Sequence, residues 1–117
     1  MMFKGIEFKQ NWFMMPNEWT DIAYHITSLA ELKVVEYVIR HTWESSVHGP
    51  PISIMLDEIQ HGRRKRDGSR MDRGTGLDKA AVVDGVQRGV SHGFLIANKT
   101  DVRLIVSEIK ETEGSLA

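Results

Sequence analysis

Residues 78–106 read DKAAVVDGVQRGVSHGFLIANKTDVRLIV, and this stretch decides the fold. Asp78 is a good N-cap for a helix that reaches about residue 92, and Gly93 is well placed as its C-terminal stop. Two short apolar runs, FLIA and VRLIV, then flank the turn NKTD, so we predict a β-hairpin over residues 94–106. The buried stripe of the helix is predicted from three valines at helical spacing: Val83, Val86 and Val90.

A central helix is predicted upstream, over residues 28–43. The sequence SLAE at 28–31 matches a capping box, in which the Ser28 oxygen accepts from an early backbone N–H and Glu31 reaches back. The apolar stripe of this helix is broad, which indicates packing on more than one side. It consists of Leu32, Val35 and Ile39, widened by Leu29, Val34 and Val38.

Two shorter helices complete the predicted helical core. The second of them is capped by Ser53 after a short extended segment at Ile52, and it stops near residue 61. Consecutive prolines at 50–51 separate it from the central helix, because proline lacks the N–H that a helix needs. The first follows Pro16 and places four apolar side chains on one face: Trp19, Ile22, Ala23 and Ile26.

The predicted order is helix, helix, short strand, helix, long loop, helix and β-hairpin. We therefore predict an α+β, mainly helical fold: a winged helix-turn-helix with a three-helix core, a β-hairpin wing and an extra N-terminal helix. With 117 residues the chain has the size of one domain. We place this domain at residues 16–106, after an N-terminal arm over 1–15 and before an acidic C-terminal tail over 107–117.

Composition narrows the function classes. The absence of cysteine excludes disulfides and thiolate metal sites, and the five histidines have no HxxxH or HxH spacing. There is no P-loop or nucleophile elbow, so we expect no enzyme, no catalytic residues, no cofactor and no metal. No apolar run is long enough for a membrane span or a signal peptide, and a cytoplasmic protein without a membrane partner is expected.

The most distinctive feature is a basic segment over residues 61–74. Six basic side chains against two aspartates leave a net charge of +4 in 14 residues, on a chain whose total is −1. The segment is rich in glycine and poor in apolar residues, which predicts a long exposed loop, poorly packed without DNA. Because five of the six are arginine, contact with phosphates or base edges is favoured over a merely solvated loop. The predicted DNA contacts are Arg63, Arg64, Lys65, Arg66, Arg70 and Arg73.

The helix after this loop is predicted to be the recognition helix. Its outward face would hold Arg88 among small residues that include Gly85, which would let the helix lie deep in the major groove. The alternative is that Gly85 and Gly89 allow close packing against another helix. Further DNA contacts are predicted at the entry to this helix and on the hairpin wing: Thr75, Lys79, Lys99 and Arg103.

Several segments together resemble the N-terminal winged-helix domain of phage and prophage replication proteins of the replication protein O type. The resemblance covers roughly residues 15–97, and the part around 32–43 is the most specific. It implies origin recognition on double-stranded DNA, with a separate region that recruits the replicative helicase. The enlarged basic loop departs from that pattern. The segments are PNEW at 16–19, AELKV at 30–34, YVIRHTW at 37–43, IS at 52–53, GTGL at 74–77 and GFLI at 93–96.

We therefore predict a double-stranded DNA-binding protein of phage replication initiation, with a homodimer and a replisome protein as further candidate partners. A transcriptional regulator of the same fold is the first alternative. A winged helix that binds proteins and not DNA is the second. A positive stripe along the loop, helix and hairpin would favour DNA, whereas a bare apolar patch would favour a protein partner.

Overall fold

The computed structural model describes residues 3, 5–6, 15–49 and 52–105, with only the backbone described for 44–48. The predicted N-terminal arm and acidic tail lie almost entirely outside these residues. No helix in the described part of the chain is long and apolar enough to cross a membrane. Its elements are α1 (Trp19–Ala23), α2 (Leu29–His48), β1 (Ile54–Met55), α3 (Leu56–His61), α4 (Lys79–Ser91), β2 (Leu95–Ala97) and β3 (Asp101–Leu104).

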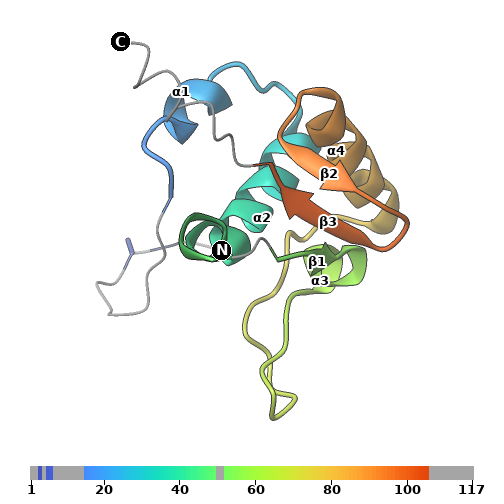
Figure 1. The fold of residues 1–117 in the computed structure, drawn as a ribbon. Helices are drawn as coiled ribbons and strands as arrows, with labels where there is room; N and C mark the ends of the chain where they lie inside the picture. The colour runs from blue at the N-terminus through green and yellow to red at the C-terminus, as the bar shows by residue number, and fades with distance from the viewer. Residues whose placement is uncertain (1–2, 4, 7–14, 50–51, 106–117) are drawn as a thin grey trace.

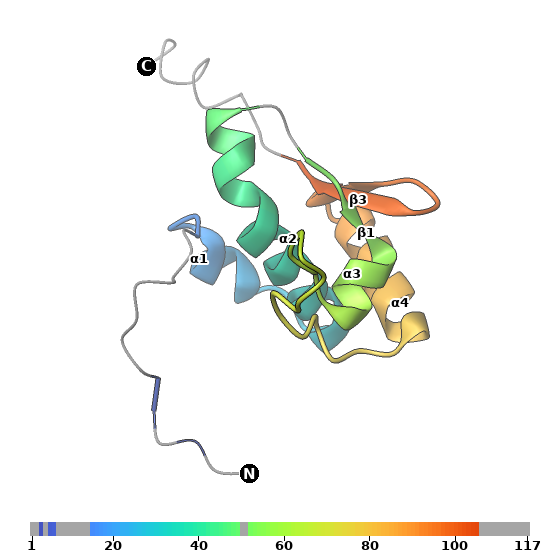
Figure 2. The same ribbon diagram turned by 90° about the horizontal axis from the view of Figure 1, so that it is seen from below.

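The strands form an antiparallel sheet in the order β1-β3-β2 that packs across α2 and α4 (Figures 1 and 2). Val102 of β3 is paired with Ile54 of β1, and Leu104 is paired with Leu95 of β2. These four side chains are buried, because side chains at alternate positions of a strand face the same side of the sheet. The expectation of an α+β, mainly helical chain is confirmed for the described residues.

The packing of α4 on α2 differs from the predicted stripe. Val86 is buried as expected, but Val90 is 43% exposed and Val83 is only half-buried. The buried face of α4 is rotated from the valine stripe and consists of Val82, Gly85, Val86 and Gly89.

Glycines explain the rotation of α4. A Cβ at Gly85 would lie 2.6 Å from the Ala30 carbonyl oxygen, and one at Gly89 would lie 2.6 Å from Leu95 Cδ1. The α4 backbone therefore lies directly on α2 and β2, where no side chain has room. The prediction that Gly85 faces outward was wrong, and close helix packing is the role of both glycines.

The predicted ends of α4 are confirmed, and those of α2 only in part. Asp78 Oδ1 accepts from the Ala81 N–H at 2.8 Å, and Gly93 has a φ of +83° directly after the last turn. Ser28 Oγ accepts from the Glu31 N–H at 3.1 Å, but Glu31 does not reach back to complete a capping box. Its buried carboxylate lies 2.6 Å from His92 Nδ1 and so connects the start of α2 to the end of α4.

Two other boundaries are corrected. Helix α2 continues to His48, one turn beyond the predicted end. Residues predicted at the start of the next helix form strand β1 instead, because they pair with β3. The helix cap is then Met55, whose N–H donates to the Glu58 carboxylate at 3.0 Å, and not Ser53.

Candidate nucleic-acid interface

Residues 63–73, here called the basic arm, form a hairpin that projects beyond α3 and away from the sheet (Figure 1). The Lys65 N–H donates to Ser69 O at 2.8 Å, and the Met71 N–H donates to Arg63 O at 2.8 Å. Gly68 closes the tip with its N–H on Lys65 O and a φ of +86°. This is the geometry of a three-residue hairpin loop that needs glycine at its last position. The segment is exposed, as predicted, but it is a hairpin and not an irregular loop.

Asp67 shapes the tip of the basic arm. Its Oδ1 accepts from the Ser69 hydroxyl at 2.6 Å and from the Ser69 N–H at 2.8 Å. These bonds lower the pKa of Asp67, although the carboxylate lies on the surface. The arm's exposed aspartate thus has a local role in the turn.

The basic side chains of the arm are mostly without acidic partners. Arg63 pairs with Glu58 at 3.1 Å, and Arg64 donates to the Gly68 carbonyl at 3.0 Å. Within the described residues, five arm cations enter no ion pair: Arg64, Lys65, Arg66, Arg70 and Arg73.

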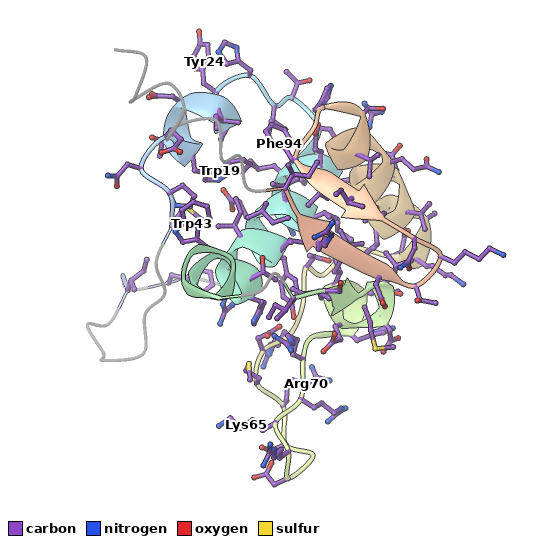
Figure 3. The ribbon with its side chains drawn as sticks, in the orientation of Figure 1. Trp19, Tyr24, Trp43, Lys65, Arg70 and Phe94 are labelled. Atoms are coloured by element: carbon purple, nitrogen blue, oxygen red, sulfur yellow. The ribbon has the colours of Figure 1, made fainter. Side chains whose placement is uncertain are left out.

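Positive charge lies on both faces of the basic arm. Arg64 and Arg70 stand directly opposite each other as an antiparallel pair. Like charges at such a position repel, so a nearby anion would relieve the repulsion. Figure 3 shows Lys65 and Arg70 pointing to opposite sides of the arm. A polyanion could therefore be contacted from either side.

The neck of the arm is a close contact between two glycines. A Cβ at Gly74 would lie 2.6 Å from the Gly62 nitrogen, and one at Gly62 would lie 2.1 Å from the Asp72 oxygen. Both glycines have a positive φ, which is +96° at Gly62 and +76° at Gly74. The two strands of the arm therefore meet where only glycine fits.

A polar cluster fastens this neck to α2. Asp72 Oδ1 accepts from the Tyr37 hydroxyl at 2.8 Å and from the Gly74 N–H at 2.7 Å. Asp72 Oδ2 lies 3.0 Å from His41 Nε2, an ion-pair distance without hydrogen-bond geometry, and both side chains are almost fully buried. The Tyr37 and His41 rings are in contact, with centroids 4.5 Å apart.

The cluster shifts the titration of all three side chains. Burial, and then the hydrogen bond to Asp72, raises the pKa of Tyr37, so the hydroxyl remains a donor. Burial lowers the pKa of His41 despite the nearby Asp72. Burial raises the pKa of Asp72, but the bonds from Gly74 and Tyr37 together with His41 outweigh it and lower this pKa overall.

These shifts predict that stability falls on acidification, in part through His41. The unfolded chain protonates His41 near its ordinary pKa of 6.5, whereas the folded protein resists protonation until lower pH. The unfolded state therefore binds more protons in that window, and stability is lost as the pH falls through it. Urea unfolding should show that the free energy of unfolding falls less between about pH 7.5 and about pH 5.5 for His41→Gln than for the parent. Equal losses would contradict a buried, neutral His41, because the other histidines are the same in both proteins.

The remaining predicted contacts are distributed unevenly. Lys79 is exposed in the first turn of α4. Thr75 is buried, and its hydroxyl donates to Ile59 O at 2.9 Å, so it is not available at the surface for a contact with DNA. Arg88 is exposed, but its guanidinium pairs with Asp84 of the same helix at 2.9 Å.

The β2–β3 hairpin lies away from the basic arm in both views (Figures 1 and 2). Lys99 is exposed in its loop, and Arg103 is half-buried opposite Ile96. Between this hairpin and α4 runs a shallow groove with a mainly apolar lining, here called the α4–β2 groove. It is lined by Leu56, Val83, Val86, Val90 and Ala97, with Gln87 and Lys99 also in its wall.

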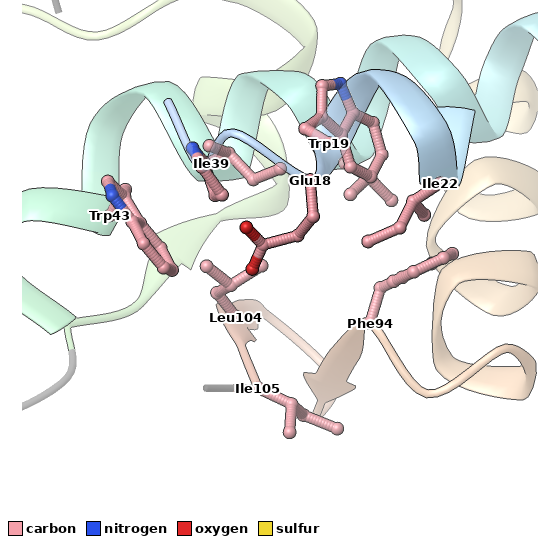
Figure 4. Close-up of a pocket in the computed structure, with 10 residues that line it drawn as sticks. Glu18, Trp19, Ile22, Ile39, Trp43, Phe94, Leu104 and Ile105 are labelled. Atoms are coloured by element: carbon pink, nitrogen blue, oxygen red, sulfur yellow. The ribbon is translucent and has the colours of Figure 1, made fainter. Parts of the chain in front are cut away.

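A second apolar pocket lies between α1, α2 and the end of β3, with the Glu18 carboxylate over its lining (Figure 4). Trp19 and Trp43 both line it, and Trp19 also contacts Phe94 edge to face, with ring centroids 5.9 Å apart. These two tryptophans pack within the protein and are not presented on the basic arm. No group of three or more His, Asp or Glu side chains is arranged to hold a metal ion in the described part of the chain.

The cations of the arm were predicted from the sequence, but the cluster that holds the arm was not. Tyr37 and His41 are four residues apart, so they share one face of α2, and this polar pair on a buried face was a usable signal. Gly62 and Gly74 bracket the basic segment, but its glycine content predicted only an exposed loop and not a close contact between the two. Asp72 had no signal of its own, because it was interpreted as a counter-charge within the loop.

Comparison of the chain with protein-family models, curated proteins and solved structures finds no match.

Proposed function

We propose that this protein binds double-stranded DNA and that the basic arm is the principal contact. One observation carries the proposal: an exposed hairpin presents five cations that have no acidic partner among the described residues. A hairpin of this length projects roughly 15 Å, and a two-stranded ribbon fits the major groove of B-DNA. The arginine guanidinium also matches the geometry of a phosphate better than a lysine ammonium does.

The order of elements supports a winged helix as the scaffold. Helices α2, α3 and α4 form the three-helix core, β2 and β3 form the wing, and β1 adds a third strand, with α1 as the extra N-terminal helix. In this arrangement α3 and α4 are the helix-turn-helix pair and α4 is the recognition helix. The arm is inserted between them, so it would meet DNA beside the start of α4 and Lys79.

The charges suggest a division of roles along this surface. The arm supplies the phosphate neutralisation. Lys79 at the start of α4, and Lys99 and Arg103 on the β2–β3 hairpin away from the arm, are expected to add little. Arg88 would have to leave Asp84 before it could reach a base, so its contribution to affinity is expected to be small. Initiation of phage replication is the role that the sequence resemblance implies, and a transcriptional regulator would use the same surface.

The test is a titration of labelled duplex with the full chain over a series of salt concentrations. Five neutralised phosphates predict that log K falls with log [salt] at a slope of about −4.5. A random duplex pool in the same assay would show whether binding has a sequence preference. Absence of duplex binding at low salt would reject the proposal.

A second candidate function is protein binding through the α4–β2 groove. It is favoured by Val90, which is 43% exposed beside an apolar lining where DNA would be expected to meet charge. Methyl NMR of Val83 and Val90 separates the two functions. If added duplex DNA shifts the arm resonances but not these methyl signals, the groove remains available for a protein partner. If both sets of signals shift, DNA covers the groove.

A further inference from the structure

In the described part of the chain, the side-chain polar contacts between the basic arm and the helical body are an ion pair of Arg63 and a buried cluster around Asp72. The arm's strands meet at Gly62 and Gly74, two residues whose backbones rotate freely in the unfolded chain. Beyond that neck, Arg63 pairs with Glu58 of α3, and both of these side chains are partly exposed. The buried connection is the hydrogen bond between Asp72 and Tyr37, and it lies beside His41.

We infer that Asp72 is a positioning residue that aims the basic arm, and that DNA affinity depends on it although its own charge opposes DNA. This inference rests on the proposed function. The arm reaches into solvent from a glycine neck, so its direction is set where the chain is bonded to α2. One carboxylate oxygen joins the Tyr37 hydroxyl on α2 to the Gly74 N–H in the neck, at 2.8 Å and 2.7 Å.

Anchoring matters for binding because an arm already held in its bound direction loses less conformational freedom on DNA. If the anchor is removed, the same cations remain, but they must be ordered during binding. The affinity should then fall while the number of phosphates that are finally contacted stays the same. If charge alone governed DNA affinity, the effect would be the opposite: removal of an aspartate beside five cations should strengthen attraction to DNA.

Asp72→Ala and Asp72→Asn separate the two explanations. Both remove the negative charge, but the asparagine oxygen still accepts from Tyr37 and Gly74. We expect Asp72→Ala to bind duplex about tenfold more weakly than the parent and Asp72→Asn to remain within about threefold of it. The salt slope should be unchanged in both. Tyr37→Phe, which removes one hydroxyl, should weaken binding to an intermediate extent and serves if Asp72→Ala does not fold.

A second readout does not depend on DNA. Backbone ¹⁵N relaxation of residues 64–70 should show a more mobile arm in Asp72→Ala and Tyr37→Phe, and a parent-like arm in Asp72→Asn. Unfolding curves for each variant fix a temperature at which all are folded. Variants that only loosened the whole fold would show mobility in α2 and α4 as well.

The outcomes separate the inference from the proposed function. Unchanged arm dynamics in Asp72→Ala, or binding as tight as or tighter than the parent, would overturn the inference. If the arm is loosened but the parent binds no duplex, the proposed function fails and the link between Asp72 and affinity fails with it, while the anchor itself stands. Weaker binding with a loosened arm in Asp72→Ala, restored in Asp72→Asn, supports both.

Discussion

Gly85→Ala is expected to destabilise the protein by about 2–3 kcal/mol, although alanine is the better helix former by about 1 kcal/mol. The new Cβ would lie 2.6 Å from the Ala30 carbonyl oxygen and 2.8 Å from Val34 Cγ2. Neither can yield cheaply, because one is backbone and the other belongs to a fully buried valine. Helices α2 and α4 would have to separate, and their contact is the centre of the core.

Urea unfolding of the variant and the parent measures this effect. Gln87→Ala is the matched control, because Gln87 is exposed on the same helix and its replacement should change stability by less than about 0.5 kcal/mol. If Gly85→Ala were more stable than the parent, helix propensity alone would govern the site and α4 could not lie directly on α2.

The same glycines show why the sequence misplaced the buried face of α4. A pattern of apolar side chains identifies a buried stripe only where burial is provided by side chains. At Gly85 and Gly89 the backbone itself is the buried surface, so the valine stripe was assigned to the core although Val90 lies outside it. The ends of this helix were predictable because Asp78 and Gly93 act on backbone groups a few residues away.

The same difference between local and distant interactions explains which parts of the candidate site could be predicted. The cations of the arm cluster in sequence, so composition was enough to find them. The hairpin was less visible, because the turn Asp67–Gly68 is flanked by polar side chains and not by apolar strands. The pairing of Tyr37 with Asp72 could not be predicted, since the two residues are far apart in sequence and meet only when the neck packs on α2. Thr75 and Arg88 were assigned to DNA by position, but their internal bonds depend on the fold.

Replacement of four arm cations by alanine is expected to weaken duplex binding by about 4 × 10³-fold at ~0.1 M salt. The substitutions are Lys65→Ala, Arg66→Ala, Arg70→Ala and Arg73→Ala, all at exposed positions without an ion pair among the described residues. Each lost phosphate contact removes about 0.9 from the salt slope, so the slope should change from about −4.5 to about −1. At ~0.1 M salt each contact contributes about eightfold in affinity through counterion release, so four lost contacts give a loss of about 4 × 10³-fold.

The matched control keeps the charge of the arm and changes its chemistry: Arg66→Lys, Arg70→Lys and Arg73→Lys. If the arm acts through phosphates, this variant should keep the parent's salt slope and lose little affinity, because lysine neutralises a phosphate as a point charge. If the arginine guanidinium groups instead contact base edges, the salt slope of this variant should stay constant while its preference among duplex sequences weakens. Stability should not change in either variant, since these side chains are exposed on a hairpin whose backbone bonds remain. A parent-like slope in the four-alanine variant would show that DNA is bound elsewhere, and Lys79, Lys99 and Arg103 would then be the cations to replace.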